Sequence, residues 1–313
     1  MFSIKELNDD SRTVALIRDL EKKKIKHVIW FTDKSRRLRN DQDTFERDTE
    51  QLFEKDKHGY LVLKNQDRYQ IEIVPHSRVT EKFPRLMNFY IAPSNSGKSY
   101  NMAGLCKQYL NMFPDNKIKY VSANPIDNDK NYKDIINEIV SERPVEWTEP
   151  VDFTDIRDEL WIFDDCDAGF SVSMEDIGLT EEAYDELTIT DRSKADRIRK
   201  NKSENALGFV NETMKSLAYN ARKNNISQCV VNHKFNPRGG NQTILLSECT
   251  GVVLFPYNSK KGVLETFLVE KLDMDKDDAK VIRNLPWVQY DFLFINNLGK
   301  PFIFTPDRIK IFD

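Results

Sequence analysis

The sequence has no apolar run long enough to cross a membrane and no linker rich in glycine or serine. A membrane-spanning helix needs about 20 consecutive, mostly apolar residues. The first ten residues carry acidic side chains and lack the apolar stretch of a secretory signal. The composition therefore predicts a soluble, intracellular protein without a membrane span.

Cysteine and histidine are also scarce, with four of each among 313 residues. None of Cys106, Cys166, Cys229 and Cys249 forms a Cys-x-x-Cys pair, and each lies in or beside an apolar run. This pattern predicts buried free thiols in a reducing compartment rather than a disulfide framework. The histidines are scattered and show no zinc-binding spacing.

The chain lacks an excess of positive charge, since 47 Lys and Arg face 51 Asp and Glu, for a net charge of -4. A protein that coats nucleic acid is usually basic overall. Any contact with phosphates must therefore come from local patches. The candidates are the run Lys22–Lys24 and a cluster of Arg192, Lys194, Arg197, Arg199, Lys200 and Lys202.

The length is compatible with two domains, and the pattern changes near residue 86. Residues 1–85 predict a small α+β region. Its expected strands cover 26–31, 60–63 and 69–74, and its charged segment 34–57 is expected to be a helix or an exposed loop.

From residue 86 to residue 313, apolar runs alternate with helical stretches, which predicts an α/β fold with a mostly parallel sheet flanked by helices. The charged segment 171–205 interrupts this pattern and is expected to be a solvated insertion, a lid or an arm. A C-terminal hairpin is expected around 297–299. Helices are expected over 99–113, 131–141, 207–224 and 276–284, and strands over 88–92, 119–123, 160–163, 227–232, 251–256 and 265–270.

The strongest motif is Ala92–Ser99, which fits the phosphate-binding pattern [AG]-x-x-x-x-G-K-[ST] between a predicted strand and helix. Backbone N–H groups of such a loop surround a phosphate, and Gly97 allows its close approach. Lys98, expected at the surface, supplies positive charge, and Ser99 supplies a hydroxyl to Mg²⁺. The predicted nucleotide-binding residues are Pro93, Ser94, Asn95, Ser96, Gly97, Lys98, Ser99 and Tyr100.

Two further segments place polar side chains at the expected ends of strands. In Leu160–Asp165, four apolar residues precede two acids, so that Asp164 can reach Mg²⁺ and Asp165 can polarise a water molecule. Later, a basic helix end at Arg222 precedes a strand that ends in Asn232, whose amide can sense a γ-phosphate. On chemistry alone, Asn232 could equally cap the next turn, and Arg222 could simply favour the helix C-terminus.

Together these motifs resemble the FtsK–HerA superfamily of P-loop ATPases, and within it the poxvirus-type genome-packaging ATPases of large DNA viruses and virophages. The resemblance is carried by residues 90–100, 162–167, 220–233 and 244–250 and covers about 86–313 outside the insertion. Ala92 departs from the family, which usually has glycine there.

The resemblance implies ATP and Mg²⁺ as cofactors, with Ser99 and Asp164 on the metal. It implies catalytic roles for Lys98, Asp165 and Asn232, and for Arg222 as an arginine finger that acts across a subunit interface.

The same resemblance implies a translocase of double-stranded DNA that works as a pentameric or hexameric ring of identical subunits. A capsid vertex protein is a further expected partner, and the host cytoplasm, a viral factory or the virion is the expected location. Two alternatives from other classes stay open. One is another P-loop enzyme, such as a helicase or a kinase, and the other is a nucleotide-binding assembly scaffold with little hydrolysis.

Overall fold

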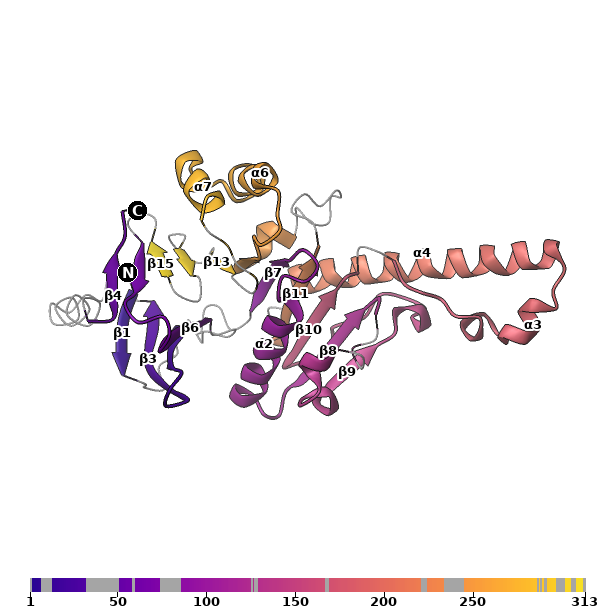
Figure 1. Cartoon of the computed structure of the whole chain (residues 1–313). Coiled ribbons are helices and arrows are strands. Elements are labelled where there is room, and N and C mark those ends of the chain that lie inside the picture. Colours follow the sequence, from indigo (N-terminus) through magenta and orange to yellow (C-terminus); the bar gives the residue numbers. More distant parts are fainter. Residues whose placement is uncertain are drawn as a thin grey trace.

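The structure is a computed structural model in which the chain forms two β-sheets with helices packed on the larger one (Figure 1). It describes residues 2–6, 13–31, 51–57, 60–73, 86–124, 126, 129–166, 169–220, 224–233, 245–285, 287, 289, 292–296, 302–304 and 308–311. Among these residues, no helix combines the length and apolar character needed to cross a bilayer.

The larger sheet joins strands from both ends of the chain. Its strands are β4 (Phe53–Lys55), β5 (Leu61–Leu63), β7 (Met87–Ile91), β8 (Lys117–Ser122), β9 (Ile139–Glu142), β10 (Glu159–Asp164), β11 (Ser227–Asn232), β12 (Gly251–Leu254), β13 (Leu293–Asn296), β14 (Phe302–Phe304) and β15 (Arg308–Ile311). They are ordered β4-β5-β15-β14-β13-β12-β7-β11-β10-β8-β9. The run from β12 to β9 is parallel, which confirms the predicted α/β fold.

The smaller sheet is antiparallel and contains only strands from the first 85 residues. Its strands are β1 (Phe2–Glu6), β2 (Thr13–Asp19), β3 (Lys24–Phe31) and β6 (Tyr69–Ile73), in the order β1-β3-β2-β6. Hydrogen bonding also crosses residue 85, because β5 pairs with β15 in the larger sheet. The division into domains at residue 85 therefore stays a prediction.

Helices cover both faces of the parallel strands. On one face lies α2 (Lys98–Met112), whose Met102 and Cys106 pack with Ile162 and Cys229 of the central strands. The other face is covered by α4 (Ile189–Asn220), α6 (Lys261–Leu272) and α7 (Lys276–Arg283). Neighbouring strand residues alternate between the two apolar clusters, as the period of two in a β-strand requires.

The α4 helix extends far beyond the sheet, and the short helix α3 (Glu181–Asp185) lies beside the N-terminal end of α4, away from the sheet (Figure 1). The expected helix over 207–224 therefore starts much earlier, inside the charged segment 171–205. Pairs such as Lys194–Asp191 and Lys200–Glu204 lie three or four residues apart, where they support a solvated helix that has little apolar surface to bury.

Two predicted elements are wrong. The expected helix over 131–141 consists of short 3₁₀ turns at 130–132 and 136–138 followed by β9, because Ile139 pairs with Ile118 at the sheet edge. The expected strand over 265–270 belongs to α6. There Leu264, Phe267 and Leu268 are buried together at helical spacing, which overrides their β propensity.

Other expectations are met to within two residues at the element ends. The strands at 88–92, 119–123, 160–163, 227–232 and 251–256 correspond to β7, β8, β10, β11 and β12, and the helix at 276–284 corresponds to α7. All four cysteines are buried thiols outside any disulfide, as predicted. Strands β13 and β14 pair antiparallel on either side of 297–299, and those turn residues lie outside the described part. Most of 34–57 also lies outside it, while 53–55 is a strand rather than a helix or loop.

Candidate functional site: the phosphate-binding loop

The loop 92–97 connects β7 to α2 at the carboxyl edge of the parallel strands. Its start is fixed to the neighbouring strand by a 2.9 Å hydrogen bond from Ala92 N to Asn232 O. Asn95 and Gly97 have positive φ angles of 62° and 102°. A side chain would strain the backbone at Gly97, so glycine there follows from the geometry of the turn into α2.

This loop borders a cavity of about 730 Å³. Ser96 is the one predicted nucleotide-binding residue that does not line it, and its buried Oγ has no hydrogen-bond partner among the described residues. Tyr100 is 67% exposed at the start of α2, where a ring can meet a ligand. The lining consists of Gln70, Pro93, Ser94, Asn95, Gly97, Lys98, Ser99, Tyr100, Asn131, His233 and Gln289.

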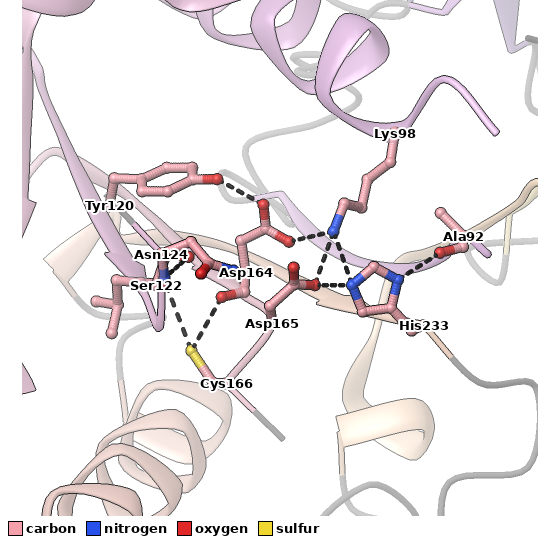
Figure 2. Close-up of polar contacts among 10 residues, drawn as sticks. Ala92, Lys98, Tyr120, Ser122, Asn124, Asp164, Asp165, Cys166 and His233 are labelled. Carbon is pink, nitrogen blue, oxygen red and sulfur yellow. Dashed lines mark hydrogen bonds and ion pairs between the residues drawn. The ribbon is translucent and has the colours of Figure 1, made fainter. Parts of the chain in front are cut away.

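The Lys98 ammonium group lies between the two acids that follow the apolar part of β10, and His233 lies beside them (Figure 2). Nζ is 2.9 Å from Asp164 Oδ1, 2.7 Å from Asp165 Oδ1 and 3.3 Å from His233 Nε2. Only 11% of the Lys98 side chain is exposed, so the expectation of a surface lysine is wrong. Burial lowers the pKa of Lys98, but the two carboxylates outweigh burial and raise it above 10.5.

Asp164 is buried at the end of β10 and is held from the opposite side by Tyr120 of β8 (Figure 2). The Tyr120 hydroxyl donates to Asp164 Oδ2. Burial raises the pKa of Asp164 above 3.8, and the positive charge of Lys98 only partly offsets this. Burial also raises the pKa of Tyr120 well above its usual range, so the phenol remains a donor.

Asp165 is less buried than Asp164 and has two basic neighbours, Lys98 and His233. Burial raises the pKa of Asp165, but hydrogen bonds from His233 and Lys98 outweigh it and bring the pKa to about 2. The contact with Asp165 in turn raises the pKa of His233 above 6.5, despite partial burial and the nearby Lys98 charge. The pKa values of the two neighbouring carboxylates thus shift in opposite directions. Burial dominates at Asp164, whereas hydrogen-bond donors keep Asp165 ionised.

Asn232 ends β11, the strand between β7 and β10, so its side chain belongs to the same sheet edge as the loop and the two acids. It is 5% exposed, and its Nδ2 has no hydrogen-bond partner among the described residues. A buried donor without a partner is costly, which makes it a candidate contact for an anionic ligand. Arg222, the predicted finger, and the neighbouring Lys223 lie outside the described residues.

Several residues of the site were not predicted. His233 directly follows the predicted Asn232, and its proximity to Asp165 depends on the pairing of β10 with β11. Tyr120 belongs to no sequence motif, because its hydrogen bond to Asp164 depends on the parallel register of β8 with β10. Gln70, Asn131 and Gln289 reach the cavity from three separate parts of the chain. No local sequence signal could have brought these three together.

The chemistry of the donors fits a magnesium nucleotide. Mg²⁺ prefers hard oxygen ligands and usually binds through one or two carboxylates, waters and substrate phosphates rather than a cage of protein ligands. The Asp164 carboxylate and the Ser99 hydroxyl supply oxygen ligands of this kind. The described residues accordingly include no group of three or more His, Cys, Asp or Glu side chains arranged to hold a metal.

Comparison with known proteins found no matching family model and no matching curated protein. Among solved structures, the chain is similar to the genome packaging NTPase B204 from Sulfolobus turreted icosahedral virus 2 in complex with AMPPCP, at 10% identity and a TM-score of 0.42, over 72% of this chain and 97% of that one. It is also similar to the pCW3 conjugation coupling protein TcpA in its monomer form with ATPgS, at 11% identity and a TM-score of 0.42, over 93% and 75% of the two chains. The α/β fold assigned above follows from the chain's own strand order.

Proposed function

We propose that this chain is a magnesium-dependent ATPase. The observation that carries the proposal is the position of the Lys98 ammonium group between Asp164 and Asp165, at the start of α2 and beside the cavity. A cation there meets phosphate oxygens at the N-terminus of a helix, where backbone N–H groups and the helix dipole also favour negative charge. The first turn of α2 contains no acidic residue that would oppose an anion.

Lys98 and the loop would bind the nucleotide together. The ammonium group turns from the carboxylates toward the β- and γ-phosphate oxygens, and backbone N–H groups of the loop donate to the same phosphates. The positive φ at Gly97 leaves space for this approach. Ser99 and Asp164 would hold Mg²⁺, which offsets phosphate charge when bound.

Asp165 and Asn232 would act on the reacting group. The ionised Asp165 accepts a hydrogen bond from water and orients the water oxygen toward the γ-phosphorus. A bond forms from that oxygen to phosphorus as the bond to the bridging oxygen of ADP breaks. Asp165 orients the water, and the proton that the water loses passes to an oxygen of the inorganic phosphate that forms. The buried Nδ2 of Asn232 donates to a γ-phosphate oxygen.

The site would be completed by a neighbouring subunit. Lys98 and His233 are the only basic side chains among the described residues that line the cavity, and both already contact Asp165. A further cation on the γ-phosphate would have to come from elsewhere. Arg222 of an adjacent subunit is the proposed source, which makes the ATPase an oligomeric ring.

We also propose that the ring moves double-stranded DNA, as a viral genome-packaging motor does. The support is the combined motif pattern of residues 90–100, 162–167 and 220–233. The solvated half of α4 adds support because it carries Arg197, an exposed cation with no ion-pair partner among the described residues.

The test is ATP turnover by the assembled protein with and without duplex DNA of arbitrary sequence. We expect DNA to stimulate turnover at low salt, and Asp165→Asn to bind ATP without hydrolysing it. Turnover that is equal in wild type and Asp165→Asn would contradict the role of Asp165, and the absence of turnover in the wild type would contradict the ATPase assignment. Normal turnover that ignores DNA at every salt concentration would leave the ATPase and reject the motor.

A further inference from the structure

Besides its contact with Lys98, His233 contacts an oxygen atom on each side of its ring (Figure 2). Nε2 is 2.5 Å from Asp165 Oδ1, and Nδ1 is 3.1 Å from the carbonyl oxygen of Ala92, the first residue of the phosphate-binding loop. The next residue back, Asn232, accepts from Ala92 N through its backbone. The dipeptide Asn232–His233 therefore contacts both Asp165 and the start of the loop, and Asn232 is also the proposed donor to the γ-phosphate.

Each ring nitrogen of His233 faces an oxygen acceptor, and Nε2 also lies 3.3 Å from the Lys98 ammonium group, which is a donor. A neutral imidazole has one N–H and can satisfy only one of them, whereas an imidazolium donates to both. The 2.5 Å distance from Nε2 to the Asp165 oxygen requires a proton between these two atoms, and the Ala92 carbonyl accepts from Nδ1, so the geometry favours the doubly protonated ring in spite of Lys98. The raised pKa of His233, caused first by its contact with Asp165, agrees with this. With Lys98, Asp164 and Asp165, the imidazolium completes a group of two positive and two negative charges.

Asp165 needs such a partner. Its φ of 57° places it in the left-handed region, which is sparsely populated by residues other than glycine and is maintained only by the surroundings. The carboxylate contacts Lys98 and His233 through the same oxygen, Oδ1. When Lys98 turns to the phosphates, the histidine is the contact that remains.

We infer that His233 is a positioning residue for ATP hydrolysis: it holds the Asp165 carboxylate in place through Nε2 after Lys98 has moved to the nucleotide. This inference rests on the proposed ATPase function. It assigns the Nδ1 contact with Ala92 to orientation of the ring, and the Nε2 contact to the orientation of the attacking water through Asp165. A misplacement of about 1 Å in such a group can reduce the rate roughly 10²-fold.

Two amide variants separate the contacts. Gln at position 233 can place an N–H near the position of Nε2 and keep the donor to Asp165. Asn can place one near Nδ1 and keep only the donor to Ala92. We expect His233→Gln to retain kcat within about threefold, and His233→Asn to lose kcat roughly 10²-fold with an unchanged KM for ATP. A purely structural role through the loop would give the reverse order.

The role of His233 is tested by steady-state kinetics on the assembled protein. ATP binding and thermal unfolding are measured on each variant as well. Retention of kcat by His233→Asn, or loss by a folded His233→Gln that binds ATP normally, overturns the inference. Asp165→Asn is the companion control. If the wild-type protein does not hydrolyse ATP, the ATPase assignment itself fails, whereas an active wild type and an inactive Asp165→Asn beside a fully active His233→Asn reject only the role of His233.

Discussion

The Tyr120 hydroxyl donates a hydrogen bond of 2.5 Å to Asp164 Oδ2 across the neighbouring strands β8 and β10. Lys98 holds the other oxygen of the same carboxylate. The orientation of Asp164, the proposed metal ligand, is therefore set by a residue of β8, a strand that contributes no residue to the lining of the cavity. Partners behind a metal ligand commonly fix its orientation and tune its affinity.

Tyr120→Phe should weaken the use of Mg²⁺. The ring keeps its edge-on packing against Tyr132, while Asp164 loses a donor and can rotate. We expect the Mg²⁺ concentration for half-maximal turnover to rise roughly tenfold or more. Titration of turnover with Mg²⁺ at saturating ATP measures this shift. Tyr109→Phe, which removes a hydroxyl bonded to Asn116 on the same face of the sheet, should leave the Mg²⁺ dependence unchanged.

Lys98→Ala should reduce stability as well as hydrolysis. The ammonium group balances two carboxylates that are only 8% and 17% exposed. Removal of one partner from a buried ion pair costs about 3 kcal/mol of unfolding free energy, and His233 limits the loss at Asp165. Urea unfolding measures the change. Addition of Asp164→Asn to Lys98→Ala should recover part of the lost stability, and strictly additive losses would contradict the coupling.

The contact between His233 and Asp165 should stabilise the fold over a defined pH range. The pKa of Asp165 is lowered from 3.8 to about 2, so its contribution is present above pH 3.8 and is lost as the pH falls through about 2. The pKa of His233 is raised above 6.5, so its contribution is present below pH 6.5 and is lost as the pH rises through the folded value.

The measurement is the difference in unfolding free energy between wild type and His233→Asn across pH. We expect the difference to be largest between pH 3.8 and 6.5 and to shrink as the pH rises through the raised pKa of His233. In an Asp165→Asn background the pH dependence of the difference should largely disappear. A difference that is constant with pH would show that the ring is not charged in the folded state.

Much of the site could be predicted from the sequence because its chemistry is local. Residues 92–99 are contiguous, Asp164 follows four apolar residues, and Asn232 follows the apolar residues 229–231. Strand order then brings these ends to one edge, as it does in parallel sheets generally. The partners Tyr120 and His233 depend on register between strands, which no local pattern encodes.

The errors in secondary structure have a similar origin. Ile136 and Ile139 have helical spacing, yet Ile139 pairs with Ile118 at the edge of the sheet. The first half of α4 has few buried residues, so hydrophobic periodicity could not reveal it. Its charged pairs at i,i+3 and i,i+4 were the remaining signal.

Arg222→Ala should bind ATP normally and hydrolyse it poorly, because an arginine finger contributes roughly 10³–10⁵ to the rate. Mixed with Asp165→Asn subunits, it should regain activity, since each variant then supplies the half of the site that the other lacks. Turnover of subunit-exchanging mixtures across the mixing ratio measures the recovery. No recovery would argue for a purely structural arginine, and Lys223→Ala is the matched comparison.

The basic cluster on α4 divides into structural and available cations, which sharpens the test for DNA. Arg199 donates to Val172 O at 2.9 Å, and Lys202 donates to Asp176 O at 2.6 Å. Both fasten the segment before α3 to the helix. Arg197 is exposed, and Lys200 makes only a 3.8 Å ion pair with Glu204. Arg197 and Lys200 are three residues apart and so share a face of the helix.

The double variant Arg197→Ala/Lys200→Ala should abolish the stimulation of ATP turnover by duplex DNA and leave basal turnover intact. A cation that binds a phosphate releases condensed counterions, so log affinity falls as log salt rises. This negative slope should become shallower by about 0.9 for each phosphate that the variant no longer neutralises. Lys215→Ala, on the sheet-covering half of α4 and paired with Glu212, is the matched control and should change neither quantity. The effect should be equal for unrelated sequences, because a motor grips the backbone rather than base edges. An unchanged salt slope in the double variant would move the DNA contact away from this arm.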